Sequence, residues 1–134
     1  MREILFRGKR IDNGEWVCGY YSMHKTGKTF IRNIGSSCLG TFEVDPKTVS
    51  EFTNMVDERG NKVFEGDICY SPGATTEYSL FVIRIDGWGC FLDYYFGGEF
   101  FDTDQVRHDD WLLDSKIIGN IHDNPELLKG EYHD

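Results

Sequence analysis

The sequence has few basic residues and no long apolar segment. It contains 14 Lys and Arg against 23 Asp and Glu, which gives a formal net charge of −9. A protein that binds nucleic acid over its whole surface needs a cationic exterior, so this class is disfavoured. No apolar run reaches the ~18 residues of a membrane span, and residues 1–7 lack the apolar region of a signal peptide. We therefore expect no membrane partner and a location in the cytoplasm.

Closely spaced cysteines are also missing. The four cysteines are separated by 20, 31 and 21 residues, so no C-x-x-C pair of a zinc or redox site is present. Their even number would allow two disulfides, but a reducing cytosol and an adequate core make disulfides unnecessary. We expect four thiols, at Cys18, Cys38, Cys69 and Cys90.

Familiar catalytic patterns are absent as well. The four histidines form no ligand-spaced pair, no serine lies in a G-x-S-x-G elbow, and the glycine-rich segments at 87–89 and 97–98 lack the lysine and helix of a Walker motif. Glu65 and Asp67 flank Gly66 in a tight turn, where we expect both carboxylates to be exposed and ionised rather than poised for acid–base work. We expect no enzymatic activity and no cofactor.

The residues that are present predict a β-rich domain. Of 134 residues, 40% are apolar and 15% aromatic, enough to build a core in a single domain. Short β-branched and aromatic runs alternate with glycine turns, beginning with a hairpin around residues 12–14. We expect a mainly β (β-rich α+β) fold, either a bent sheet of short strands or an SH3-like small barrel, with an N-terminal β-meander and two short helices.

The helices are predicted from capping residues. Asp45 suits an N-cap, Pro46 suits the first helical position, and Val49, Phe52 and Val56 fall on one helical face, so we expect a helix over about 46–56. Asn124 and Pro125 predict a second helix over about 125–129. The polar segment after the first helix permits a subdivision into 1–56 and a barrel-bearing part, 57–134.

Charge is distributed unevenly along the chain. Residues 1–45 carry seven bases and five acids, whereas residues 46–134 carry seven bases and eighteen acids. Gly97 and Gly98 open a segment that we expect to be an acidic loop reaching about Asp110. Such a dipolar chain offers two surfaces to partners and a route to head-to-tail self-association.

Two groups of side chains are candidates for binding. Clustered carboxylates suit hard cations, but the spacing in the acidic loop is not that of a calcium loop, so a solvated loop is the favoured interpretation. The metal candidates are Asp102, Asp104 and His108. A basic strand face beside aromatic rings suits phosphates and stacked bases, although any half-buried strand also alternates. The nucleic-acid candidates are Arg2, Arg7, Lys9, Arg10, Trp16 and Tyr20.

Several short blocks in one order resemble the YopX family of small phage and prophage proteins. They are Arg2-Glu3-Ile4 with Phe6-Arg7-Gly8-Lys9, Gly14-Glu15-Trp16-Val17, Val44-Asp45-Pro46, Phe64-Glu65-Gly66-Asp67-Ile68, and Ile118-Gly119-Asn120-Ile121 with Asn124-Pro125-Glu126-Leu127-Leu128. Residues 50–54 depart from the family's Gly-Gln-x-Thr-Gly stretch, and residues 71–113 match it poorly. The resemblance implies a phage or prophage product in a bacterial cytoplasm, compatible with a homo-oligomer, and transfers no catalytic residue.

Our leading hypothesis is a non-enzymatic interaction protein that self-associates and presents its acidic second half to a host or phage protein. A nucleic-acid-binding protein that uses the N-terminal hairpin is the alternative. A metal-dependent enzyme at Asp102, Asp104 or His108 is a third and weaker possibility.

Overall fold

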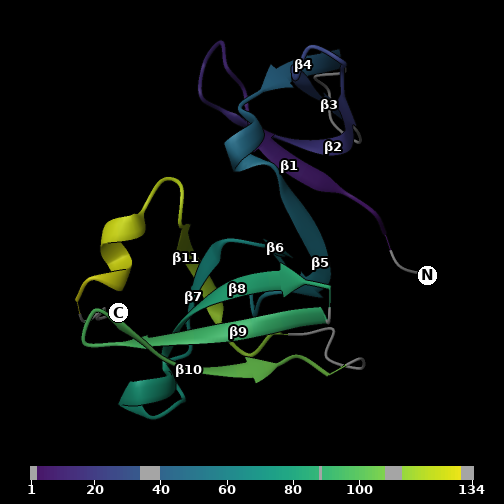
Figure 1. Ribbon diagram of the computed structural model, residues 1–134. Helices are drawn as coiled ribbons and strands as arrows, with labels where there is room; N and C mark the ends of the chain where they lie inside the picture. Colours follow the sequence, from purple (N-terminus) through teal and green to yellow (C-terminus); the bar gives the residue numbers. More distant parts are fainter. Residues whose placement is uncertain (1–2, 34–39, 88, 108–112, 131–134) are drawn as a thin grey trace. The chain divides into compact units, whose positions relative to one another are not determined.

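The computed structural model describes residues 3–33, 40–87, 89–107 and 113–130 (Figure 1). The chain divides into two compact units, residues 1–52 and 53–134, and each is described separately below. The regular elements of the described residues are antiparallel strands and short 3₁₀ turns. The predicted mainly β fold is therefore confirmed.

The first unit is built on a four-stranded antiparallel meander. Its strands, in chain order and in order across the sheet, are β1 (Phe6–Lys9), β2 (Trp16–Met23), β3 (Thr29–Asn33) and β4 (Gly40–Val44). A bridge between Arg10 and Val44 joins the end of β4 to the end of β1, so the meander curls back on itself. The concave side holds a small apolar core that consists of Val17, Ile31 and Val44, with Phe6, Phe42 and Val49 packed around them.

Two glycines let the strands of this meander approach closely. A Cβ atom at Gly8 would lie 3.0 Å from the Val44 side chain, and one at Gly19 would overlap the carbonyl oxygen of Arg32 on β3. Gly19 thus fits where any larger residue would push β2 away from β3. The N-terminal meander predicted from the glycine turns is present.

The helix predicted over 46–56 is wrong. Only Pro46–Thr48 is helical, as the single 3₁₀ turn η1, and it begins as predicted with the Asp45 carboxylate accepting a hydrogen bond from the amide of Lys47 at 3.0 Å. The rest is strand β5 (Ser50–Val56), whose first residues pair with β1. Asn54 has a φ of +69°, which interrupts the alternation so that Phe52 and Met55, three residues apart, are both buried. Buried apolar residues that are three positions apart therefore matched the spacing expected of a helix, although they lie on a strand.

The second unit contains the end of β5, strand β6 (Lys62–Phe64) beside it, and a five-stranded antiparallel sheet. The sheet order is β10 (Glu99–Gln105), β9 (Gly89–Phe96), β8 (Leu80–Asp86), β7 (Asp67–Tyr70) and β11 (Lys116–Asn120). Strands β10 and β11 are its two edges, so the described strands of this unit form an open sheet. The predicted SH3-like barrel is wrong, and the bent sheet of short strands is the correct alternative.

Apolar side chains cover both faces of this five-stranded sheet. On one face Phe81 and Ile83 of β8 pack with Met55, Val63 and further residues; on the other, Val82 and Leu80 pack with Leu127 and Leu128. The last two belong to η3 (Pro125–Leu128), a 3₁₀ turn where a helix over about 125–129 was predicted. A third turn, η2 (Thr76–Tyr78), precedes β8.

Candidate interaction surfaces

The acidic segment after Gly98 is a strand rather than the predicted loop. Gly97 and Gly98, with φ of +63° and +84°, form the tight turn of a hairpin, and β10 returns along β9 from it. Two successive positive φ values match the turn geometry that suits the twist of paired strands. All seven residues of β10 are exposed, and β10 is an edge of its sheet.

Aromatic rings accompany the acids on this strand. Phe100 and Phe101 are 58% and 46% exposed, and Phe96 at the end of β9 is 41% exposed. The Tyr78 ring of η2 meets the Phe101 ring edge-on, with 5.3 Å between their centroids. We call β10 together with Phe96 and Tyr78 the β10 edge, because these residues combine unburied apolar area with the carboxylates of Glu99, Asp102 and Asp104.

Asp102 is tied into the β10 edge by two hydrogen bonds. Its carboxylate accepts from the Tyr78 hydroxyl at 3.1 Å and from the Thr103 amide at 2.8 Å. The bond to Asp102, more than burial, raises the pKa of Tyr78 above its ordinary value, because ionisation would place two anions side by side.

The metal candidates are not assembled into a site by the part of the chain that is described. Asp102 and Asp104 lie on β10, and His108 falls outside the described residues. Among the residues that the structure describes, no group of three or more His, Cys, Asp or Glu side chains is placed to hold a metal ion.

A polar cluster supports β10 from the neighbouring strands. Arg84 of β8 donates from Nε to Asp93 of β9 at 2.7 Å and from Nη2 at 3.2 Å, and Thr103 of β10 donates its hydroxyl to the same carboxylate at 2.7 Å. Arg84 also pairs with Asp86 at 2.7 Å and lies over the Phe91 ring. These contacts link three adjacent strands across one face.

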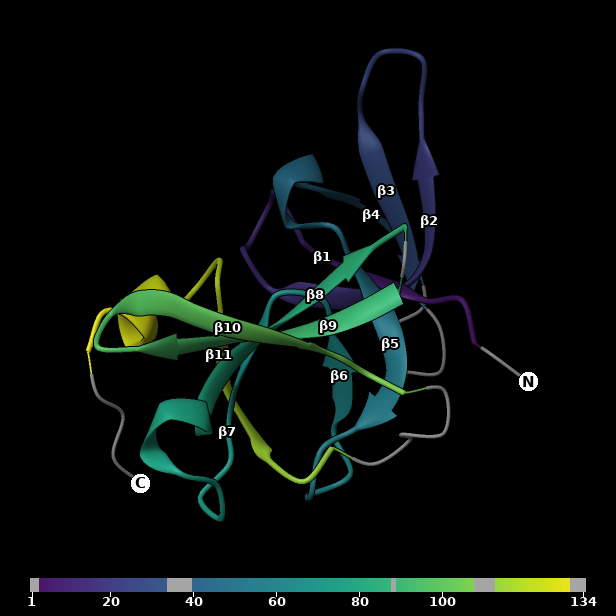
Figure 2. The same cartoon turned by 60° about the horizontal axis from the view of Figure 1, so that its bottom comes forward.

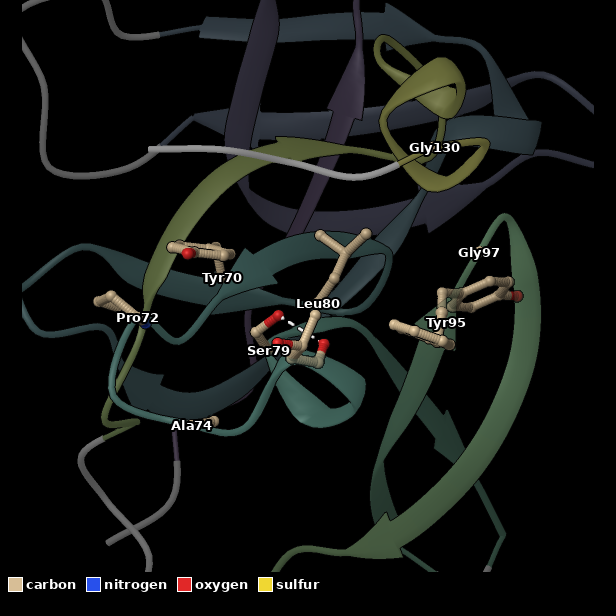
Figure 3. A pocket seen from close by; sticks show the side chains of 10 residues that line it. Tyr70, Pro72, Ala74, Ser79, Leu80, Tyr95, Gly97 and Gly130 are labelled. Atoms are coloured by element: carbon tan, nitrogen blue, oxygen red, sulfur yellow. Dashed lines mark hydrogen bonds between the residues drawn. The ribbon is translucent and has the colours of Figure 1, made fainter.

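A shallow cavity of about 260 Å³ opens in the second unit near the β9–β10 turn (Figure 3). Its wall includes the rings of Tyr70 and Tyr95 and the side chain of Leu80, and Ser79 donates its hydroxyl to the Thr76 carbonyl oxygen at 3.0 Å. Among the residues that the structure describes, no charged side chain is part of this wall, so they do not supply the convergent polar groups of a typical ligand site.

The predicted exposure of the Glu65–Asp67 turn is wrong for Asp67. Asp67 is buried, and its carboxylate accepts a hydrogen bond from the Phe64 amide at 2.8 Å, while Glu65 accepts one from the Ile85 amide at 3.2 Å. Both carboxylates thus bind backbone amides and fix the β6–β7 turn. Among the cysteines, Cys18, Cys69 and Cys90 are thiols, and Cys38 lies outside the described residues.

The first unit brings most of the nucleic-acid candidates together. The register pairs Lys9 with Trp16 and Arg7 with Cys18, which places Arg7, Lys9, Trp16 and Tyr20 on the same side of the β1–β2 pair, opposite the buried Val17. Arg7 and Lys9 lie over the Trp16 ring, 4.7 and 5.9 Å from its centroid. We call this side of the first unit's sheet the outer face.

Arg10 does not join this group. Arg10 is bound to Asp12 at 2.6 Å and lies 4.0 Å from the centroid of the Phe42 ring, whose side chain packs against the core side of the sheet. Arg2 falls outside the described residues. The sequence reasoning missed Arg32, which is exposed and directly opposite Tyr20. Strand alternation over residues 29–33 was the signal that would have found it.

A family model described as YopX protein matches residues 5–129, nearly the whole chain. The chain belongs to the YopX family. The resemblance seen in the ordered sequence blocks is therefore confirmed. No curated protein matches this YopX-family chain. Among its described residues, no helix is long and apolar enough to cross a membrane.

Proposed function

We propose that this YopX-family protein is a non-enzymatic, phage- or prophage-encoded interaction module that binds a host or phage protein in the bacterial cytoplasm. The observation that carries the proposal is the β10 edge: a fully exposed strand at the margin of a sheet. An edge strand presents backbone donors and acceptors to which an extended segment of another chain can add.

The side chains of the β10 edge favour one kind of partner. Glu99, Asp102 and Asp104 supply negative charge, and Phe100 and Phe101 supply apolar area that remains exposed in the chain alone. Soluble proteins usually place charged side chains on an edge strand, because these oppose pairing with other chains. On β10 all of these charges are negative. We propose a partner segment that is extended and carries Lys or Arg beside apolar residues.

We also propose that the protein self-associates through unlike surfaces. The first unit has eight Lys and Arg against six Asp and Glu, whereas the second has six against seventeen. In a symmetric antiparallel pairing of two β10 strands centred on Asp102, that carboxylate would face its own copy, and like charges directly opposite are destabilising. A head-to-tail contact between the first unit of one copy and the second unit of another brings opposite charges together.

Capture of a partner from bacterial lysate, followed by binding measurements with the identified protein, tests the main proposal. Two variants probe the β10 edge: the pair Asp102→Lys and Asp104→Lys, and Phe100→Ser. Asp114→Lys is the matched control, since Asp114 is exposed in the same unit but outside the strand. The proposal expects both β10 variants to weaken binding and the control to bind normally. It also expects slower amide exchange of β10 in the complex.

Equal binding by all variants, or protection confined to residues outside β10, would overturn the proposal. For self-association, sedimentation velocity at low and high salt is the measurement. Head-to-tail contact between opposite charges predicts that salt dissociates the oligomer.

Nucleic-acid binding by the first unit is a second candidate function. The observation that favours it is the placement of Arg7, Lys9, Trp16 and Tyr20 on one face, together with Arg32.

A further inference from the structure

We propose that the outer face of the first unit binds single-stranded nucleic acid, with Tyr20 as the stacking platform and Arg32 as the phosphate contact. The inference rests on the second candidate function and deepens it by naming the contacts and the class of nucleic acid. It is independent of the β10 edge, which belongs to the other unit.

The register of β2 and β3 makes Tyr20 and Arg32 a pair. They are directly opposite each other in the hairpin, on the side away from the buried Ile31. Side chains opposite each other on antiparallel strands have Cβ atoms about 5 Å apart. Tyr20 is 57% exposed and Arg32 is exposed, so an aromatic ring and a guanidinium lie side by side on the surface of the hairpin. Figure 2 shows the backbone of this β2–β3 hairpin.

Trp16 supports this surface rather than forming its stacking platform. Its ring is half-buried and lies under the Arg7 guanidinium and the Lys9 ammonium. A ring that already holds cations on its face is a poor stacking platform. It holds the Lys9 ammonium on the outer face, whereas Nε and Nη2 of Arg7 are buried. Base stacking therefore falls to Tyr20, and Trp16 acts by orienting Lys9.

The charge around the hairpin suits a polyanion. No Asp or Glu occurs between Trp16 and Phe42, although the whole chain has 23 acids in 134 residues. The same stretch contains Lys25 and Lys28 in the turn between β2 and β3, besides Arg32. The His24 ring lies against the Phe30 ring at an angle of 38°, with 4.5 Å between their centroids, which adds a second ring near the turn.

One acid marks the limit of this surface. Glu43 on β4 is directly opposite Phe30 and hence on the outer face. Its carboxylate would repel a phosphate that follows the strands past Phe30. Removal of this charge is therefore a gain-of-function test of the same surface.

The single-stranded form is favoured because an exposed ring can stack only on a base that is itself unstacked. Aromatic rings on a sheet with cations beside them are the usual means of binding single strands without sequence preference. Duplex DNA hides its base faces and would use only the cations. Stacking on Tyr20 should therefore contribute to the binding of single strands and not to the binding of duplex DNA.

Fluorescence anisotropy with the full chain and a labelled oligothymidine of about 20 nucleotides, at about 50 mM salt, is the test. We expect Tyr20→Ala to weaken binding about fivefold or more, and Tyr20→Phe to bind like the wild type, because the ring is what stacks. Arg32→Ala should weaken binding and reduce the slope of log affinity against log salt by about 0.7. Glu43→Gln should tighten binding. Lys47→Ala, an exposed cation of η1, is the matched control and should bind normally.

An abasic strand of the same length and a duplex are the competing probes. We expect the abasic strand to bind more weakly than oligothymidine and to be insensitive to Tyr20→Ala, and the duplex to compete poorly. The inference is overturned if the wild type does not bind at low salt, if Lys47→Ala costs as much as Arg32→Ala, or if the duplex binds better. Far-ultraviolet circular dichroism confirms that each variant is folded. Because none of these residues lies on β10, a negative result here leaves the β10 proposal untouched, and the reverse holds as well.

Discussion

Arg84 and Asp93, on neighbouring strands of the second unit, form a two-pronged ion pair, with Nε–Oδ2 and Nη2–Oδ1 distances of 2.7 and 3.2 Å. The Asp93 side chain is only 15% exposed, and its carboxylate also accepts the hydroxyl of Thr103 on β10. The pair therefore joins the edge strand to the interior of the sheet.

Asp93→Ala should loosen β10. The change leaves Arg84 and Thr103 without a shared acceptor, and we expect it to lower the free energy of unfolding by about 1–2 kcal/mol. Urea unfolding measures the loss, and amide exchange should accelerate in β10 more than in β7. Asp86→Ala, which removes a second and more exposed partner of Arg84, should have the smaller effect. A larger effect for Asp86 would contradict this role for Asp93.

Asp57 should make stability depend on pH. Burial raises the pKa of this carboxyl, but hydrogen bonds from the amides of Asn61, Ile117 and Arg59 outweigh burial, so the net pKa lies below its ordinary value. A lowered folded-state pKa contributes stability above the unfolded pKa of about 3.9, and this stability is lost as pH falls through the folded pKa.

Asp57→Asn is therefore expected to lower the free energy of unfolding at pH 7 by about 1–3 kcal/mol. The difference from the wild type should shrink when denaturant unfolding is repeated below about pH 4. Asp114→Asn is the control, because Asp114 is exposed. A difference that stays constant from pH 7 to acid would show that Asp57 acts without its charge.

Gly19→Ala should destabilise the first unit. The added methyl group would overlap the Arg32 carbonyl oxygen, so β2 and β3 must separate, at a cost of about 3 kcal/mol. Gly73→Ala is the matched control, since a Cβ there meets nothing within 4 Å and its φ is ordinary. Thermal unfolding compares the two variants. Equal melting temperatures for Gly19→Ala and the wild type would refute the close approach.

Asp102→Asn should lower the pKa of Tyr78 towards its ordinary value of about 10. The hydrogen bond to a carboxylate opposes ionisation of the phenol, and a neutral amide removes most of that opposition. Tyrosine NMR titration with site assignment measures the change. Asp104→Asn is the comparison and should shift this pKa less, because Asp104 acts on Tyr78 only through space. An unchanged Tyr78 pKa in Asp102→Asn would contradict the hydrogen bond.

Turn chemistry made the meander and the tight turn between β6 and β7 predictable. Glycines at positions 14, 27 and 66 have positive φ, as tight turns between strands require. The same rule applied to Gly97 and Gly98 would have predicted β10, but the acidic residues that follow are typical of loops and outweighed it. Pairing with β9 decides the conformation there, and pairing is a non-local property.

The helix over 46–56 failed for a different reason. Local signals placed the first turn correctly at Asp45 and Pro46, but they do not report where the turn ends. Pairing of Ser50 and Glu51 with β1, more than forty residues earlier, takes the chain into a strand. Such distant partners cannot be read from a local period.

The residues of the outer face could be predicted only in part from the sequence. Alternation along the first strands correctly grouped Arg7, Lys9, Trp16 and Tyr20, but it could not show that Arg10 is held by Asp12 and Phe42. Arg32 was missed because it comes from the next strand. Its partnership with Tyr20 exists only through the register of the hairpin.

The passage of β5 from one unit to the next has a consequence for synthesis on the ribosome. Its first residues complete the first unit by pairing with β1, so every strand of that unit has been made once residue 52 emerges. The second unit must wait for β11, because Lys116–Asn120 pairs with β7. Domains generally fold in order as they leave the ribosome. The β2–β3 hairpin of the first unit is thus exposed to nucleic acid or to other chains while the acidic second unit is still being translated.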